Sequence, residues 1–229
     1  MCPVFLCLLD LPSGLAQPWG TREQMEDDMR LMKVLVLGVA MVVPIVAMAE
    51  NKSVNIRPDV ATVTVETGAG AVEIGRIQDN ANHLTGDWAR TSRPCPLFCV
   101  QPMSPAEGVT TIGELEIMDM LQREDAVVVD SRVAKWYYNG TIPGAQHIPY
   151  TEVSDRLDEL GCEPDFDGWI CDNAKPVALF CNGPWCGQSP TAIRAMIGAG
   201  YPAEKIFYYR GGMQVWRMLG LTVIEPKDG

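Results

Sequence analysis

The chain has 229 residues, of which 47% are hydrophobic and 21% are charged, and its formal net charge is -11. This is the composition of a globular protein, long enough for one domain of good size or for one domain with an extension. The acidic charge and the lack of a basic cluster argue against nucleic acid as a partner.

Residues 29–49 have the three parts of a secretory signal peptide. Arg30 and Lys33 precede a short apolar run, and Ala47 and Ala49 provide the small residues of a cleavage site. A membrane anchor is the alternative, which the shortness of the apolar run disfavours. We therefore expect an exported protein that is located in the periplasm and is free of the membrane after cleavage.

The predicted cleavage site divides the chain into segments. Because a signal peptide normally begins at the start codon, residues 1–28 are interpreted as a mis-assigned upstream segment, with a genuine start at Met1 as the alternative. Residues 50–108 are expected to form an N-terminal extension, and residues 109–229 the main domain.

Six cysteines follow the cleavage site, and they are Cys95, Cys99, Cys162, Cys171, Cys181 and Cys186. An even number of cysteines in an exported protein indicates disulfide bonds, although sequence alone does not fix the pairing. Neighbours along the chain make three local pairs, and a structural disulfide is the preferred interpretation for the first two. Metal binding is disfavoured, because these spacings are not CxxC and no histidine lies close in sequence.

The extension contains two β-prone runs, residues 60–65 and 71–77, and the glycines between them predict a β-hairpin. Residues 78–108 are polar and contain several prolines. We expect this long segment to lie over the domain, pinned by the first cysteine pair, because a disordered tail would not need apolar residues. The apolar residues that we expect it to bury are Trp88, Phe98 and Val100.

From residue 111 onward, helix and strand patterns alternate. Thr111 and Glu114 have the spacing of a capping box at the start of a helix. Alternating strands and helices predict a mainly parallel sheet covered on both faces, with the functional site at the carboxyl ends of the strands. Asp130, Cys181 and Arg210 each follow a predicted strand, so we expect them at one edge of the sheet. The patterns predict strands over 126–129, 145–148, 177–180 and 206–209, helices over 134–138, 153–160, 190–199 and 213–219, and an acidic loop over 161–175.

Cys181 precedes a loop with two glycines and a proline, which can turn tightly and direct backbone N–H groups to one point. Ser189 followed by Pro190 predicts the start of the next helix. The positive end of that helix would lower the pKa of the Cys181 thiol and bind an oxyanion, which indicates nucleophilic attack by a thiolate. The alternative is a buried cysteine with no chemical role.

The order of four sequence motifs resembles that of the rhodanese-like domain, and together they span roughly residues 111–224. The resemblance implies a three-layer α/β fold with a central, mainly parallel sheet, to which the extension adds its β-hairpin. It also implies that Cys181 carries sulfane sulfur as a persulfide and passes it to a thiophilic acceptor. The motifs are VVVDSR (127–132), GTIPGAQHIP (140–149), VALFCNG (177–183) and YYRGGMQVW (208–216).

The resemblance also implies roles by position. Asp130 and Arg132 match the acidic and basic pair after the first central strand, for which a structural salt bridge is the preferred interpretation. Arg210 matches the residue before paired glycines, where it would attract an anionic donor or tie the loop to Asp130. The implied anion-binding loop comprises Asn182, Gly183, Trp185, Gly187, Gln188 and Ser189.

The loop departs from the rhodanese pattern at two positions. Gln188 stands where many sulfurtransferases have a basic residue, which weakens the case for thiosulfate, and no arginine ends the loop as phosphatase activity would require. Cys186 could attack a persulfide or sulfenic acid on Cys181, forming a disulfide that a reductant must reopen. A permanent disulfide between Cys181 and Cys186 is the structural alternative.

We therefore predict an exported enzyme of the thiosulfate sulfurtransferase type. Its predicted partners are a small sulfur-containing anion or a protein thiol, together with a thiol reductant for the loop cysteines. A thiol-disulfide redox protein that uses Cys181 and Cys186 is one alternative, and a non-catalytic binding module is another. No cofactor and no metal are predicted.

Overall fold

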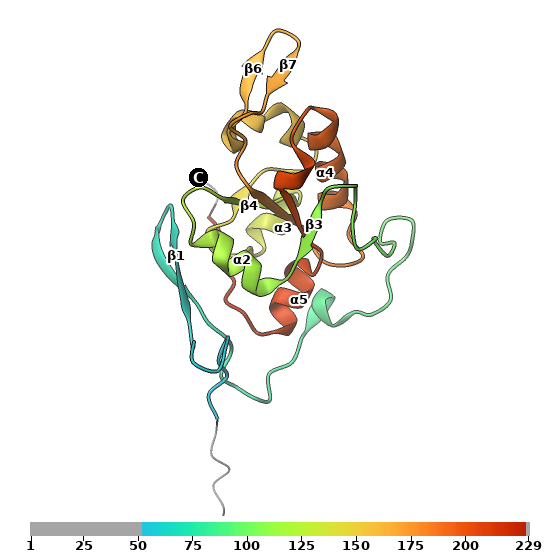
Figure 1. The fold of residues 1–229 in the computed structure, drawn as a ribbon. Helices are drawn as coiled ribbons and strands as arrows, with labels where there is room; N and C mark the ends of the chain where they lie inside the picture. Colours follow the sequence, from blue (N-terminus) through green and yellow to red (C-terminus); the bar gives the residue numbers. More distant parts are fainter. Residues whose placement is uncertain (1–51, 228–229) are drawn as a thin grey trace, which may run out of the picture. The chain divides into compact units, whose positions relative to one another are not determined.

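The computed structural model describes residues 52–227 (Figure 1), and the predicted signal peptide and upstream segment lie outside the described residues. The main sheet has five strands in the order β3-β9-β8-β4-β5, and each strand pairs in parallel with its neighbours. The predicted α/β fold with a parallel sheet is thus confirmed. The strands are β3 (Thr110–Ile112), β4 (Val127–Asp130), β5 (Gln146–His147), β8 (Val177–Phe180) and β9 (Ile206–Tyr209).

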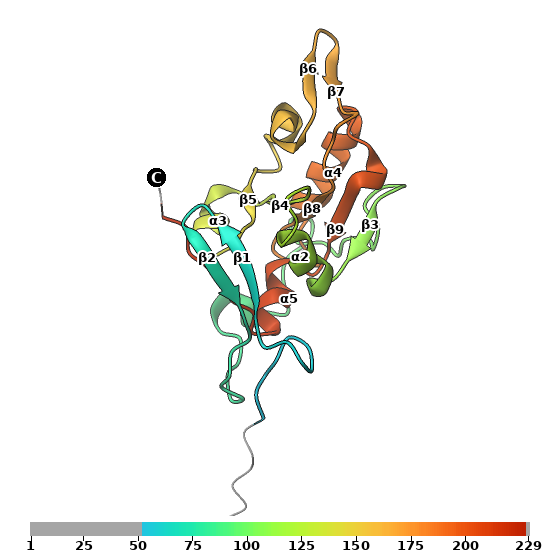
Figure 2. The same cartoon turned by 60° about the vertical axis from the view of Figure 1, so that its left-hand side comes forward.

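Helices cover both faces of this sheet (Figure 2). No helix in residues 52–227 has the length and apolar character that a membrane span requires. The α-helices are α2 (Glu114–Leu121), α3 (Ala134–Tyr138), α4 (Gln188–Gly198) and α5 (Gly212–Met218), and the 3-10 turns are η1 (Gly86–Ala89), η2 (Val153–Asp155), η3 (Leu157–Leu160) and η4 (Ala203–Lys205).

The alternation of side chains along β8 builds the two apolar layers. Val177 and Leu179 belong to the layer that contains the buried residues of α4, η2 and η3. Ala178 and Phe180 belong to the opposite layer, with the buried residues of α2 and α5. Because all four side chains are fully buried, β8 is the centre of the fold. Cys181, which directly follows β8, is therefore anchored to a fully buried strand.

The extension adds the predicted β-hairpin, formed by β1 (Val63–Thr67) and β2 (Gly70–Ile74). Its turn is shorter and its strands are shifted relative to the prediction, because Thr67 pairs with Gly70 and donates its hydroxyl hydrogen to the Gly70 carbonyl. Val65 and Ile74 are buried in the layer of α2 and α5, so the hairpin belongs to the core of the domain.

The predicted capping box at Thr111 is wrong. Thr111 lies in β3, whose pairing with β9 fixes an extended backbone there. Helix α2 begins after Gly113, whose backbone N–H donates to Glu116 Oε2 at 2.9 Å. Glycine has no side chain to complete a capping box, so only half of that motif is present.

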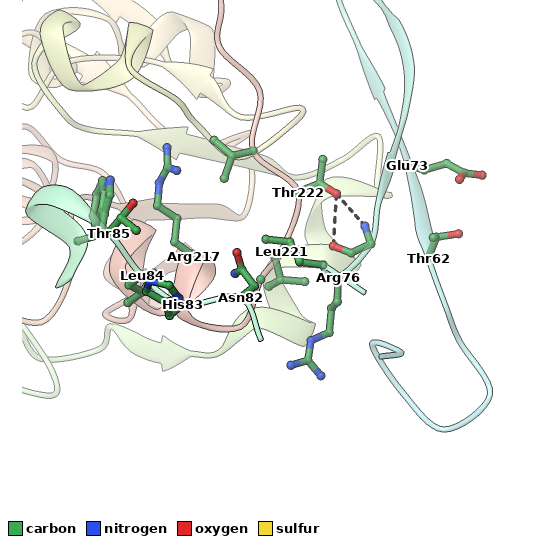
Figure 3. A pocket seen from close by; sticks show the side chains of 15 residues that line it. Thr62, Glu73, Arg76, Asn82, His83, Leu84, Thr85, Arg217, Leu221 and Thr222 are labelled. Atoms are coloured by element: carbon green, nitrogen blue, oxygen red, sulfur yellow. Dashed lines mark hydrogen bonds between the residues drawn. The ribbon is translucent and has the colours of Figure 1, made fainter. Parts of the chain in front are cut away.

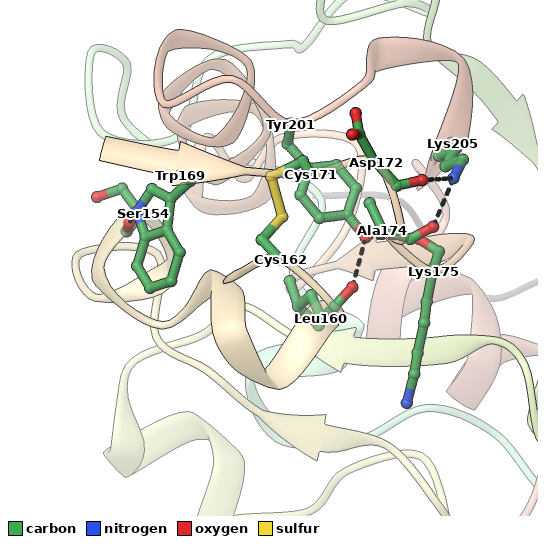
Figure 4. The surroundings of a disulfide bond; sticks show 10 residues. All are labelled: Ser154, Leu160, Cys162, Trp169, Cys171, Asp172, Ala174, Lys175, Tyr201 and Lys205. Atoms are coloured by element: carbon green, nitrogen blue, oxygen red, sulfur yellow. Dashed lines mark hydrogen bonds between the residues drawn. A yellow bond between two sulfur atoms is a disulfide. The ribbon is translucent and has the colours of Figure 1, made fainter. Parts of the chain in front are cut away.

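The predicted helix over residues 153–160 is also wrong, since that segment forms the two 3-10 turns η2 and η3. The predicted acidic loop contains a second hairpin, formed by β6 (Glu163–Asp165) and β7 (Gly168–Ile170). A disulfide between Cys162 and Cys171 closes the base of this hairpin (Figure 4). Beside it, the Tyr201 hydroxyl donates to the Leu160 carbonyl at 3.2 Å, which holds the hairpin base on the domain.

Candidate active site

Three strand ends meet at one edge of the sheet, as predicted. Asp130 ends β4, Cys181 follows β8 and Arg210 follows β9, and these three strands are parallel neighbours. Their carboxyl ends therefore share one edge. The three side chains nevertheless have different hydrogen-bond partners there.

The loop after Cys181 is held by the start of α5. The Met213 N–H donates to the Cys181 carbonyl at 3.0 Å, and the Gln214 N–H donates to the Asn182 carbonyl at 2.9 Å. Gly212 makes this approach possible, because its φ is +52° and a β-carbon there would lie 2.3 Å from the Cys181 carbonyl oxygen. Gly212, the second glycine of the YYRGG motif, therefore allows α5 to hold Cys181 in place.

The Cys181 thiol is buried, with 2% of its surface exposed. Its sulfur accepts a hydrogen bond from the Ser189 hydroxyl at 3.1 Å, and in the protonated form it donates to the Cys186 carbonyl at 3.2 Å. Burial raises the pKa of this thiol, but hydrogen bonds from the Cys186 thiol, the Ser189 hydroxyl and the N–H groups of Ser189 and Gly183 outweigh it. The resulting pKa is about 7, so a thiolate is available at neutral pH.

Ser189 acts on Cys181 from inside the helix. We predicted that Ser189 precedes α4 as its cap, but α4 begins at Gln188 and its N-cap is Gly187. The Ser189 hydroxyl is therefore free to donate to the Cys181 sulfur instead of capping the helix. The first turn of α4 thus supplies the thiolate with a side-chain donor, a backbone donor and the positive end of the helix dipole.

Asp130 and Arg132 form a fully buried ion pair, which confirms the preferred structural interpretation. Arg132 Nη2 lies 2.6 Å from Asp130 Oδ2, and both side chains have 0% exposure. The same guanidinium donates to the Gly140 carbonyl at 2.7 Å and to Asn182 Oδ1 at 3.2 Å, while Thr141 donates to Asp130 at 2.7 Å. This pair joins the end of β4 to residues 182–187, the active-site loop. None of these hydrogen bonds goes to Cys181.

The side chains of the other predicted loop residues do not converge on the thiol. Asn182 accepts from Arg132, and Gln188 Oε1 lies 4.0 Å from Cys186 Sγ as its acceptor. The Trp185 ring packs edge to face on Phe98, with ring centres 5.3 Å apart. The donors that act on the thiol are therefore the Cys186 thiol, the Ser189 hydroxyl and backbone N–H groups.

A cover segment from the extension, residues 93–101, lies on the active-site loop. The Gln101 N–H donates to the Pro184 carbonyl at 2.8 Å. The Arg93 guanidinium lies 4.0 Å from the centre of the Trp185 ring. Sequence reasoning predicted a segment lying over the domain but did not identify Arg93 and Gln101 as part of the site. The predicted burial of Val100 is wrong, since its side chain is 83% exposed.

Arg210 fastens this cover segment. Its Nε and Nη2 atoms donate to the Gln101 carbonyl at 3.2 and 2.9 Å. We predicted that Arg210 would attract an anion or bond to Asp130, and the bonds that the structure shows go to Gln101 instead. The cover segment itself is closed by a disulfide between Cys95 and Cys99, whereas Cys181 and Cys186 are both free thiols. The first two predicted cysteine pairs are therefore formed and the third is not.

An open cavity of about 520 Å³ lies elsewhere, between the hairpin and the chain that follows α5 (Figure 3). The Gly75 N–H donates to Thr222 Oγ1 at 2.9 Å across it, and Arg217 contributes to its lining. This cavity shares no residue with the active-site loop and contains no cysteine. Among residues 52–227, no three His, Cys, Asp or Glu side chains gather as a metal site would require.

The Cys181 loop lies in the part of the chain that resembles known proteins. The family model described as "Rhodanese-like domain" matches residues 115–219. An HTH-type transcriptional regulator from Mycobacterium tuberculosis is 31% identical over 122 residues, which are 53% of this chain, and the match spans only 46% of the regulator.

Two solved structures are similar to about half of this chain. A rhodanese-related protein from Thermoplasma volcanium is 21% identical, with a TM-score of 0.38, over 51% of this chain and 99% of that protein. A thiosulfate sulfurtransferase from Pseudomonas aeruginosa is 23% identical, with a TM-score of 0.40, over 52% of this chain and 21% of that enzyme.

Proposed function

Residues 115–219 are a rhodanese-like domain, and from this premise we propose that the chain is a sulfurtransferase in which Cys181 carries sulfane sulfur as a persulfide. The main support is the environment of Cys181, where Ser189, Cys186 and backbone N–H groups lower the pKa of a thiol that burial would otherwise keep protonated. Such a thiolate is a strong nucleophile at neutral pH.

In the first step the thiolate attacks the outer sulfur of a sulfane donor such as thiosulfate. A bond forms between Cys181 Sγ and that sulfur, the sulfur–sulfur bond of the donor breaks, and sulfite leaves with the electron pair. The N–H groups of Gly183 and Ser189, which stabilise the thiolate, are also the donors available to the persulfide anion. In the second step a thiol or cyanide takes the outer sulfur, and the Cys181 thiolate is restored.

The charges around the loop favour a small or weakly charged donor. Gln188 is neutral, and the Arg210 guanidinium is bonded to the Gln101 carbonyl. A dianion such as thiosulfate would therefore be bound by backbone N–H groups, the Ser189 hydroxyl and the α4 dipole, while the Arg93 guanidinium lies over the Trp185 ring. We expect a persulfidated small thiol of low charge to be a better donor than thiosulfate.

We also propose that the protein acts outside the cytoplasm, in the periplasm. The disulfides Cys95–Cys99 and Cys162–Cys171 support this, because disulfides form and persist in oxidising compartments. The two reactive cysteines then need a reducing partner to stay free, since they share that compartment. The segment that would direct export, residues 29–49, lies outside the described residues.

A turnover assay with cyanide as acceptor tests the activity. The purified protein should form thiocyanate from polysulfide, from a persulfidated small thiol and, more slowly, from thiosulfate. Cys181→Ser should lower thiocyanate formation with every donor to the rate measured without protein. Thr191→Ala, an exposed position on the first turn of α4, should leave it unchanged. If Cys181→Ser turned over as fast as the unmodified protein, the proposed role of Cys181 would be wrong.

A further inference from the structure

The active-site loop holds a second thiol that simple sulfur transfer does not require. Cys186 is buried, with 5% of its surface exposed, and it is a free thiol like Cys181. The chain reverses between the two cysteines, because the Cys186 N–H donates to the Gly183 carbonyl at 2.9 Å. This turn brings the Cys186 carbonyl oxygen to 3.2 Å from Cys181 Sγ, so the two residues are in contact.

The Cys186 thiol is also placed to hold a proton. Its hydrogen bond to Cys181 is the main cause that raises the pKa of Cys186, and burial raises it further. Cys186 therefore remains protonated while Cys181 is ionised. Its Sγ lies 4.0 Å from Gln188 Oε1, which occupies the place of the basic residue that the family pattern led us to expect. Where the family pattern has a cation, this chain therefore has the neutral Gln188, which accepts from the Cys186 thiol.

We infer that Cys186 resolves the Cys181 persulfide, so that the domain releases sulfane sulfur as hydrosulfide. This inference rests on the proposed function. The persulfide first takes the proton of Cys186, and the Cys186 thiolate then attacks Cys181 Sγ. A Cys181–Cys186 disulfide forms, the bond to the outer sulfur breaks, and that sulfur leaves with the proton as HS⁻. The outer sulfur is reduced by two electrons and the two cysteine sulfurs are oxidised. An external dithiol then reduces the disulfide and restores both thiols.

Burial of the site favours this internal reaction over transfer to a large acceptor. Cys181 is 2% exposed, and Gln101 of the cover segment is bonded to Pro184 in the same loop. A protein thiol must displace the cover segment to reach the persulfide, whereas Cys186 is already in contact. Hydrosulfide is small enough to leave a site of this kind. The cycle converts a sulfane donor and a dithiol into hydrosulfide and a disulfide.

Single turnover without reductant tests the inference. The fully reduced loop, with both structural disulfides intact, is mixed with one equivalent of polysulfide, and free sulfide and the Cys181–Cys186 peptide are quantified. Beyond any sulfide that comes from the donor as the persulfide forms, the unmodified protein should release up to about one more equivalent of sulfide. Its Cys181–Cys186 peptide should lose the mass of two hydrogen atoms, and dithiothreitol should restore that mass. Cys186→Ser and Cys186→Ala should release no further sulfide and keep one added sulfur on Cys181. Two variants are used because the hydroxyl of serine, unlike alanine, can still donate to Cys181.

The outcomes separate this inference from the proposed function. If the unmodified protein keeps the added sulfur on Cys181 and releases no sulfide, the resolving role is overturned while the persulfide carrier stands. If a Cys181–Cys186 disulfide forms without release of sulfide, the pair reacts by simple oxidation and the inference is again overturned. If neither the unmodified protein nor the Cys186 variants gain sulfur, both the proposed function and the inference that rests on it are overturned.

Discussion

At Cys181, burial and hydrogen bonding act on the pKa of the thiol in opposite directions. Burial raises the pKa, because a charge is poorly solvated inside a protein. Four donors from Cys186, Ser189 and Gly183 more than compensate and lower it to about 7. The thiolate fraction, and with it the rate of attack, should therefore rise with pH through a midpoint near 7.

Removing one donor should move that midpoint. In Ser189→Ala we expect the pH profile of Cys181 alkylation by iodoacetamide to shift upward by about one to two pH units, since a hydrogen bond to a charged group contributes roughly 1.5–3 kcal/mol. Thr191→Ala removes an exposed hydroxyl from the same helical turn and should leave the profile in place. An unchanged midpoint in Ser189→Ala would show that the hydroxyl does not stabilise the thiolate.

We expect the buried pair of Asp130 and Arg132 to stabilise the fold and to take no direct part in the chemistry of Cys181. Asp130→Ala leaves an unpaired guanidinium in a fully buried site, which we expect to lower the free energy of unfolding by about 3–5 kcal/mol in urea titrations. The exposed pair of Arg123 and Asp125 is the control, and Asp125→Ala should leave the free energy of unfolding nearly unchanged. Equal losses in the two variants would contradict this account.

At the scale of elements, we expect the cover segment to limit access to Cys181. Phe98→Ala removes the ring that packs on Trp185, a contact worth about 0.5–1.5 kcal/mol, so we expect Cys181 to react roughly 2- to 10-fold faster with a bulky maleimide. Leu97→Ala is the matched control, because Leu97 is 76% exposed and its loss should change nothing. If both variants reacted at the rate of the unmodified protein, the segment would not limit access.

The sequence patterns correctly predicted the strands and helices that bury one or both of their faces. The apolar run of β8 and the strand, loop and helix around Cys181 follow from the sequence, because burial and glycine content leave few alternatives. The β6–β7 hairpin was missed, since its strands are three residues long and almost entirely exposed, and the Cys162–Cys171 disulfide closes its base. The capping box at Thr111 failed because pairing with the distant strand β9 overrides local propensity.

The predicted helix over residues 153–160 shows the same limit. Val153, Leu157 and Leu160 have helical spacing and are all buried, so the apolar pattern was correct. The backbone departs from helical geometry at Arg156, where φ is -125° and ψ is 30°, and the segment splits into two short turns. Either conformation buries the same three side chains, and periodicity alone does not distinguish them.

At the scale of the whole molecule, the extension packs against the main domain beside Cys181. Arg210 and Gln101 are 109 residues apart in sequence, and their hydrogen bonds fasten the extension next to the loop that follows Cys181. No periodic pattern encodes a contact of that range, so the motifs identified Cys181 but not its cover.

Export is tested on the whole chain. When the full chain is produced in a bacterium with two membranes, we expect the periplasmic form to begin at Glu50, because the small residues at Ala47 and Ala49 define the cleavage site. Ala49→Leu should block cleavage and leave the chain on the membrane. An unprocessed cytoplasmic protein with reduced Cys95 and Cys99 would contradict the proposed location.

The most direct test of persulfide carriage by Cys181 is peptide mass mapping of the Cys186→Ser variant after brief exposure to polysulfide. In this variant the persulfide cannot pass to a loop disulfide, so the peptide that contains Cys181 should gain the mass of one sulfur atom and lose it again to cyanide. A Cys181 peptide of unchanged mass, in a variant whose Cys181 still alkylates with iodoacetamide, would contradict the sulfurtransferase account.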